Sequence, residues 1–231
     1  LEEFAGSRDV ARRGAAGPGG AAGPGGTAAA GSAGAGATDV DKEAALDFGR
    51  AFHRMMELLL DPRRPAPPDE AALEAAALEA AEEFGIGPRE ELFELGAKAL
   101  GSDIVARAAA AENVLAEPPF MLSVDTETGE SGTLSGRLDL VFESEGGWTV
   151  VDFKTDDVDA AGVEERLESY RPQGAAYAYA LESLGVSPVI EVIFYFVRPG
   201  IAASAGGGRE LAARGAELVG GAIAASTPSS P

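Results

Sequence analysis

The spacing of the apolar residues changes near residue 118, and this change constrains the fold more than any other feature of the chain. Upstream of it, apolar side chains recur at the three- and four-residue spacing that is typical of helices. Downstream of it, short apolar runs bounded by Gly, Pro and Asp predict strands over residues 119–125, 132–143, 148–153 and 189–197. A helical pattern over residues 163–184 separates the last two strands. This order predicts an α/β domain that begins with a helical region.

Four helices are predicted upstream of the change. The first covers residues 41–60 and ends before a group of prolines. The others cover residues 69–84, 88–100 and 102–115. Because residues 69–115 are rich in Ala and Glu, a composition typical of helices with solvated acidic faces, we interpret them as a helical insert.

The two ends of the chain differ in composition from the middle. Residues 14–38 contain ten Gly and ten Ala, so they have few side chains whose burial could offset the lost backbone entropy. We therefore predict a low-complexity linker or loop over residues 1–40 and a folded domain over residues 41–200. A flexible tail, with one short helix around residues 210–219, is predicted over residues 201–231. The chain begins with Leu1 rather than Met, which suggests a piece of a longer protein.

Composition excludes several kinds of site. The chain has no Cys, which rules out disulfides, iron–sulfur clusters and thiolate zinc sites and fits a reducing compartment. No apolar run approaches the about 18 residues that span a bilayer, so no membrane partner is expected. The net charge of −20 argues against nucleic acid as a partner, because binding to nucleic acid depends largely on neutralising phosphates. A nucleic-acid partner can therefore be inferred only from specific residues that form a suitable site.

An Asp and a Lys interrupt the end of the predicted strand over residues 148–153. Side chains alternate along a strand, so Asp152 and Lys154 point to one face and Phe153 to the other. Opposite charges at the end of an apolar strand are costly unless they are paired or bind something. Taken alone, this pair could equally be a surface salt bridge.

A further acid, Asp139, interrupts the preceding strand between two leucines. If the turn at Gly146 and Gly147 joins the two strands as a hairpin, Asp139 and Asp152 lie on neighbouring strands. Carboxylate oxygens hold Mg²⁺, and a Lys can orient or deprotonate an attacking water. Two carboxylates and one ammonium at one end of a sheet are therefore suited to metal-assisted hydrolysis.

Three motifs follow one another along the chain: Gly136-Arg137-Leu138-Asp139, Val151-Asp152-Phe153-Lys154-Thr155 and Gln173-Gly174-Ala175-Ala176-Tyr177. Together they resemble the motifs of PD-(D/E)xK nucleases, and of the RecB- and AddA-like group in particular. The resemblance implies that Asp139, Asp152 and Lys154 are catalytic. It also implies that both Asp side chains and the Phe153 carbonyl bind metal, and that the Gln and Tyr of the third motif lie beside the site. Their spacing of four places them on one helix face, although alone they could simply flank a core stripe.

Two residues upstream extend the resemblance. His53, the only histidine, lies in Gly49-Arg50-Ala51-Phe52-His53, which is similar to the G-x-x-x-H motif whose His is a metal ligand in the RecB/AddA group. A lone His on a helix is otherwise more often packed or solvated. Gly49, one turn earlier, favours the ligand role because it permits a close approach. Glu117 is similar to a family glutamate before the first strand, and we assign it an auxiliary role.

The resemblance covers residues 41–200 and implies a restriction-endonuclease-like core, with a central mixed sheet flanked by helices. The implied activity is that of a Mg²⁺-dependent deoxyribonuclease, of the exonuclease type, for which Mn²⁺ can substitute. The implied partners are DNA, single-stranded ends in particular, and a superfamily-one helicase on the same parent chain or an associated subunit. The implied setting is double-strand-break repair and recombination in a prokaryotic cytoplasm.

Two alternatives stay open at this point. The chain could have the nuclease fold and bind DNA or a partner without cutting, or it could be an acidic module that mimics DNA, as the charge of −20 suggests. The presence of His53, Asp139, Asp152 and Lys154 weakens the first alternative. A DNA mimic has no need for Lys154 at the end of a sheet, so a metal titration separates the second alternative from a nuclease.

Overall fold

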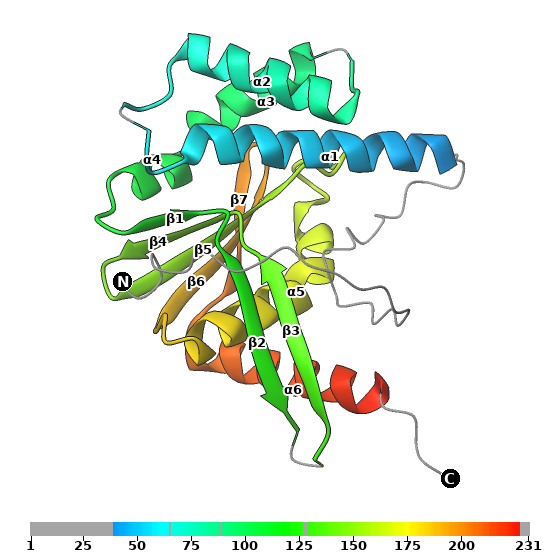
Figure 1. The fold of residues 1–231 in the computed structure, drawn as a ribbon, viewed down its shortest axis with the longest axis vertical. Coiled ribbons are helices and arrows are strands. Elements are labelled where there is room, and N and C mark those ends of the chain that lie inside the picture. Colours follow the sequence, from blue (N-terminus) through cyan, green and yellow to red (C-terminus); the bar gives the residue numbers. More distant parts are fainter. Residues whose placement is uncertain (1–38, 65, 88, 127–128, 227–231) are drawn as a thin grey trace, which may run out of the picture.

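The computed structural model describes residues 39–64, 66–87, 89–126 and 129–226. Within them, a five-stranded sheet lies between two layers of helices (Figure 1). The N-terminal helices pack on one face, and the C-terminal helices pack on the other together with a two-stranded sheet. The predicted α/β class, with a central mixed sheet, flanking helices and an N-terminal helical region, is confirmed.

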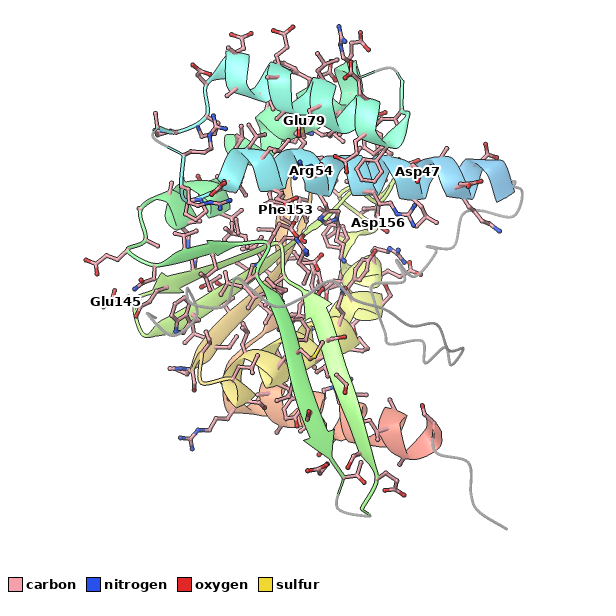
Figure 2. All side chains as sticks on the ribbon, in the orientation of Figure 1. Asp47, Arg54, Glu79, Glu145, Phe153 and Asp156 are labelled. Atoms are coloured by element: carbon pink, nitrogen blue, oxygen red, sulfur yellow. The ribbon has the colours of Figure 1, made fainter. Side chains whose placement is uncertain are left out.

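The N-terminal layer consists of α1 (Asp39–Leu60), α2 (Glu70–Phe84), α3 (Glu90–Leu100) and α4 (Asp103–Ala109). The Asp69 side chain caps the start of α2 by accepting a hydrogen bond from a backbone amide, and Gly85 ends this helix with a φ of 64°. Arg54 of α1 joins the two helices through an ion pair of 3.0 Å to Glu79 of α2 (Figure 2). A second ion pair, of 3.1 Å, joins Arg54 to Glu83 of the same helix. The predicted fourth helix, over residues 102–115, is too long, because a strand begins soon after its true end.

The main sheet has the strand order β1 (Val114–Ala116), β4 (Leu140–Ser144), β5 (Gly147–Lys154), β6 (Val189–Phe196) and β7 (Ile201–Gly206). Among the described strands only β5 and β6 pair in parallel, and helix α5 (Val163–Ser183) connects them. Alternation along β5 places Val151 and Phe153 in the core under α1–α4, and Val150 in the core under α5. The end of β5 is therefore enclosed by helices on both faces.

The strand predicted over residues 132–143 is in fact two strands in different sheets. β3 (Ser131–Arg137) pairs with β2 (Pro119–Asp125) in a separate antiparallel sheet, whereas β4 pairs with β5. The change of sheet falls at Leu138 and Asp139. The apolar pattern does not reveal this break, because buried leucines continue through it: Leu134 precedes it, Leu138 lies at it and Leu140 follows it.

The prediction of a flexible tail over residues 201–231 is wrong for residues 201–226, although the short helix expected around residues 210–219 is present as part of a longer one. β7 pairs antiparallel with β6, and α6 (Gly208–Ser226) packs along α5 (Figure 1). The small residues serve close packing here, since a Cβ at Gly215 would lie 2.0 Å from the carbonyl oxygen of Ala175. A composition rich in Gly and Ala was therefore mistaken for a sign of flexibility.

Most of the linker predicted over residues 1–40 lies outside the described residues, and α1 begins within its last two positions. None of the helices in the described part of the chain combines the length and apolarity needed to cross a membrane.

Candidate active site

The chain crosses between the two sheets twice, and an acid lies at each crossing. Glu117 stands between β1 and β2, and Asp139 between β3 and β4. The amide of Glu117 donates a hydrogen bond to the carbonyl oxygen of Asp139 at 2.9 Å, so the two crossings lie side by side. Glu117 has a φ of 51°, a left-handed conformation that residues with a Cβ rarely adopt. Backbone strain of this kind is often found at functional sites.

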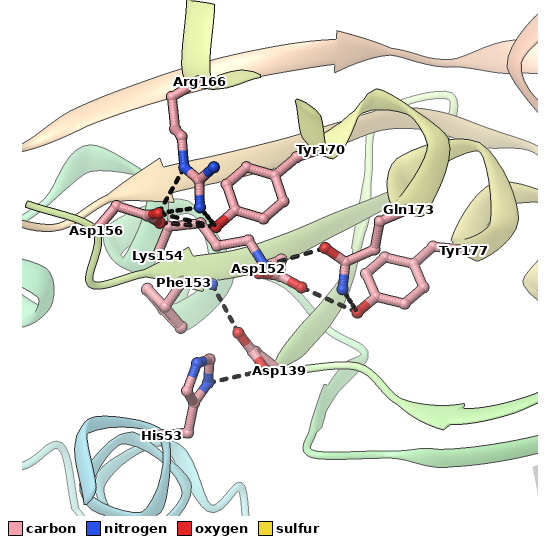
Figure 3. A network of polar contacts seen from close by, with 10 residues as sticks. All are labelled: His53, Asp139, Asp152, Phe153, Lys154, Asp156, Arg166, Tyr170, Gln173 and Tyr177. Atoms are coloured by element: carbon pink, nitrogen blue, oxygen red, sulfur yellow. Dashed lines mark hydrogen bonds and ion pairs between the residues drawn. The ribbon is translucent and has the colours of Figure 1, made fainter. Parts of the chain in front are cut away.

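Helix α1 and strand β5 hold the Asp139 side chain between them (Figure 3). Nδ1 of His53 lies 3.1 Å from Oδ1 of Asp139. The other oxygen, Oδ2, accepts a hydrogen bond of 2.6 Å from the backbone amide of Phe153. Phe52, next to His53, packs edge-on against Phe153 and fixes α1 over the end of β5. Each oxygen of Asp139 therefore faces a nitrogen from a different element.

Asp152 and Lys154 project from one side of β5 toward α5, as the strand alternation predicts. Nζ of Lys154 lies 2.7 Å from Oδ2 of Asp152 and donates a hydrogen bond of 3.0 Å to Oε1 of Gln173. The hydroxyl of Tyr177 donates to Oδ1 of Asp152 at 3.0 Å and accepts a bond of 2.6 Å from Nε2 of Gln173. The four side chains form a closed ring of polar contacts (Figure 3).

A second polar group behind Lys154 was not identified from the sequence. The ammonium of Lys154 lies 4.1 Å from the centre of the Tyr170 ring, a favourable cation–π contact. The Tyr170 hydroxyl donates to Asp156, which also forms an ion pair of 2.5 Å with Arg166. Tyr170 precedes Gln173 by three positions on α5, and this helical spacing was the signal that could have revealed it.

Burial and neighbouring charges shift the pKa values of the acids at the site. Burial raises the pKa of Asp152, and the Asp139 carboxylate adds to the rise, against the effect of Lys154. Burial also raises the pKa of Glu117 to about 8, with Asp139 as the second cause. For Asp139 burial acts in the same direction, but the charge and hydrogen bond of His53 outweigh it and its pKa is lowered.

The interaction between His53 and Asp139 also shifts the pKa of the histidine. Burial lowers the pKa of His53, but the charge and hydrogen bond of Asp139 outweigh burial and raise the pKa to about 9. Burial thus disfavours the charge of all three carboxyl groups, and only for Asp139 does a neighbouring histidine outweigh this effect. Additional positive charge at this position would stabilise all three.

The arrangement fits a hard divalent cation. His53, Glu117 and Asp139 each offer a ligand atom, and these atoms lie within 4.8 Å of one another. Ligands on one Mg²⁺ lie up to about 4.2 Å apart, twice the usual Mg–O distance, so a small inward movement is enough. Oδ2 of Asp152 is buried, and no donor in the described residues bonds to it with hydrogen-bond geometry, although Lys154 is close. This oxygen therefore faces an ammonium rather than a fixed hydrogen-bond donor, and a cation could replace that ammonium as its partner.

The structure brings together every side chain that the sequence analysis selected: His53, Glu117, Asp139, Asp152, Lys154, Gln173 and Tyr177. Glu117 lies in the possible ligand cluster rather than beside it. At Phe153 the observed contact is made by the amide, whereas the carbonyl was expected to be the ligand. The close approach expected at Gly49 is made by the Thr155 side chain, since a Cβ at Gly49 would lie 3.3 Å from Oγ1 of Thr155.

Known proteins share features with this chain. A family model described as the PD-(D/E)XK nuclease superfamily matches residues 30–223. An ATP-dependent helicase/nuclease subunit of Bacillus cereus (strain AH820) is 35% identical over 111 residues, and its counterpart of the same name in Bacillus anthracis is 38% identical over 111 residues. Each match covers 41% of this chain and only 9% of the relative. The solved structure of SSO0001 is similar over 82% of this chain and 87% of its own, with a TM-score of 0.40 and 12% identity, too distant to support an argument.

Proposed function

Because this chain belongs to the PD-(D/E)XK nuclease superfamily, we propose that it hydrolyses phosphodiester bonds in DNA with the help of Mg²⁺, for which Mn²⁺ can substitute. The observation that supports this most directly is the position of the His53, Glu117 and Asp139 ligand atoms, within 4.8 Å of one another. The pair of Asp152 and Lys154 lies beside them, with Nζ of the Lys 2.7 Å from Oδ2 of the Asp.

Each residue has a distinct role in this proposal. His53, Glu117, Asp139 and Asp152 would hold the cation, with the Phe153 carbonyl as a further ligand. When bound, the cation polarises the scissile phosphate and makes a neighbouring water more acidic. The Lys154 ammonium orients the attacking water and offsets the negative charge that develops on the phosphate.

Three other side chains fix the position of Lys154. Its Nζ donates to Oε1 of Gln173, whose amide nitrogen is in turn bonded to the hydroxyl of Tyr177. The Tyr170 ring packs under the ammonium, with Nζ of Lys154 4.1 Å from the centre of the ring. A lysine with so many contacts loses little conformational freedom when the substrate arrives.

The name and size of the relatives support a wider proposal. We propose that this chain is the nuclease module of a bacterial helicase–nuclease that acts in the cytoplasm in double-strand-break repair and recombination. Its substrate would be single-stranded DNA ends, cut exonucleolytically. The net charge of −20 is consistent with this, because an acidic module binds DNA weakly and needs a helicase to deliver the strand.

A cleavage assay tests the proposal. The 231-residue chain is incubated with linear single-stranded, linear double-stranded and circular DNA, with Mg²⁺, with Mn²⁺ and with EDTA. We expect cleavage of the linear single strand in either metal, slower cleavage of the duplex, and none in EDTA. Absence of cleavage under all conditions, with metal still bound, would favour a silent binding module. Absence of both cleavage and metal binding would favour an acidic DNA mimic.

Replacing His53 with Ala is expected to weaken Mn²⁺ binding by at least about tenfold and to raise the metal concentration needed for cleavage. The fold should persist, because 35% of the His53 side chain is exposed. Calorimetric titration measures the affinity, and circular dichroism checks the fold. Arg50→Ala is the matched control, since it alters an exposed side chain one turn earlier on α1. Equal metal affinity in the His53→Ala and wild-type proteins would restrict His53 to a structural role.

A further inference from the structure

The two-stranded sheet of β2 and β3 has one packed face and one open face. The packed face contacts α5 and α6: the Phe120 ring lies edge-on to Tyr177, and a Cβ at Gly132 would meet the Ile223 side chain of α6 at 2.7 Å. The opposite side chains point away from the protein. Met121 is 72% exposed, the highest value among the exposed large hydrophobic residues of the described chain.

The open face has an unusual composition for this protein. Its residues lie in four register pairs: Pro119 with Arg137, Met121 with Ser135, Ser123 with Thr133, and Asp125 with Ser131. Between Arg137 and Asp125, therefore, the face carries three hydroxyl groups and a Met but no carboxylate. In a chain with a net charge of −20, a polyanion meets less repulsion along such an uncharged strip than along the acidic helices.

One end of this strip meets the metal cluster. Arg137 is 56% exposed, and its guanidinium lies 3.8 Å from both Glu117 and Glu57. Asp139, two residues further, is in the cluster with Glu117. Figure 1 shows β2 and β3 extending from this point away from α1 toward the C-terminal end of α6. The strip ends at Asp125, the first acidic residue along it. Ser131 donates a hydrogen bond of 2.6 Å to the Asp125 carboxylate.

We propose that the open face of β2 and β3 binds a single strand of nucleic acid and leads it to the cation site. This inference rests on the proposed nuclease function and names the path of its substrate. Arg137 contacts the phosphate nearest the site, and the hydroxyls of Ser123, Thr133 and Ser135 donate hydrogen bonds to phosphates further out. Met121 packs against a base or sugar. Contacts of this kind do not depend on base sequence.

A protein partner suits this face less well. Interfaces between proteins have an apolar centre rich in aromatic side chains, and here a single Met stands among Ser and Thr. A lone exposed apolar side chain within a hydroxyl-rich strip matches the mixed backbone and base contacts of single-stranded binding instead.

A pair of charge substitutions at Thr133 tests the proposal. Thr133 is exposed, so neither Lys nor Glu should disturb the fold. Affinity for a fluorescein-labelled single strand of about 20 nucleotides is measured by anisotropy in Ca²⁺, to permit binding without turnover, over a range of salt. We expect Thr133→Lys to strengthen binding about threefold to tenfold and Thr133→Glu to weaken it by a similar factor. The slope of log K against log salt should steepen by about 0.7 in the Lys variant, the value for one added phosphate contact on a single strand.

Ala75→Lys and Ala75→Glu are the matched controls. They make the same changes in net charge at an exposed position on α2, which lies at the opposite end of the molecule from the tips of β2 and β3 (Figure 1). Equal effects at residues 75 and 133, or no effect at either, would overturn the proposed path. Cleavage by the wild-type chain would show in that case that the nuclease function stands. Failure of the wild-type chain both to bind and to cut DNA would overturn the function and the path together.

Discussion

Replacing Asp139 or Asp152 with Asn is expected to reduce the rate of DNA cleavage by about a thousandfold or more. Each change keeps the shape of the side chain and removes one negative charge from the proposed cation site. The cation contributes several kcal/mol of charge stabilisation, and about 1.4 kcal/mol corresponds to a factor of ten in rate. Calorimetric titration should show weaker Mn²⁺ binding in both variants.

The same two variants should differ in stability, which separates the roles of the two acids. In EDTA at neutral pH, Asp152→Asn should be as stable as the wild-type chain or more stable. The reason is that the raised pKa of Asp152 means that its ionised form is disfavoured in the folded state, and the Asn oxygen can still accept from Tyr177. Asp139→Asn should be less stable, since the lowered pKa means that its ionised form is favoured by His53 and the Phe153 amide.

Thermal unfolding followed by circular dichroism measures these differences. Asp103→Asn is the matched control, because it removes one charge from an exposed position in the first turn of α4 and should leave cleavage within about twofold. Wild-type cleavage by pure Asp152→Asn protein would contradict the assignment of this carboxylate to the cation site.

The parts of the site that follow from local patterns were predictable from sequence. Period-two alternation along β5 determines that Asp152 and Lys154 share one side, and a spacing of four on α5 determines that Gln173 and Tyr177 do. The ring of contacts among these four side chains confirms both inferences. Such relations depend on only one element each, so the sequence of that element is sufficient.

The parts that depend on two or more elements were less predictable. Asp139 was expected within one strand, yet it lies where the chain passes from one sheet to the other. Glu117 reaches the cluster through a backbone with a φ of 51°, which nothing in its side chain favours. Both positions arise because the two crossings are hydrogen-bonded to each other, and this contact joins residues 22 positions apart.

The error at the C-terminus has a related cause. Gly loses more backbone entropy than other residues on folding, and neither Gly nor Ala buries much apolar surface to offset such a loss. In the folded chain the same residues let the backbone of α6 come close to α5, as at Gly215. These residues contribute to packing only once α5 is folded against them. Composition alone therefore indicated a tail.

Replacing Lys154 with Met is expected to abolish most cleavage while Mn²⁺ binding is kept or strengthened. The rate should fall by about a hundredfold to ten-thousandfold, the usual contribution of a group that orients or deprotonates a water. Metal binding should not suffer, because Nζ of Lys154 lies 2.7 Å from Oδ2 of Asp152 and competes with a cation for that oxygen. Met keeps the apolar stem in contact with the Tyr170 ring.

This opposite pair of effects distinguishes Lys154 from the acids, whose loss should weaken metal binding and cleavage together. Lys98→Met is the matched control: it removes the same charge from an exposed lysine on α3, whose Nζ donates a hydrogen bond to the carbonyl of Arg198. Cleavage in single-turnover conditions and Mn²⁺ titration are measured on both proteins. If Lys154→Met loses metal binding in proportion to cleavage, the lysine holds Asp152 in place for the cation. If instead cleavage is lost with metal bound, as we expect, Lys154 acts on the water and the phosphate themselves.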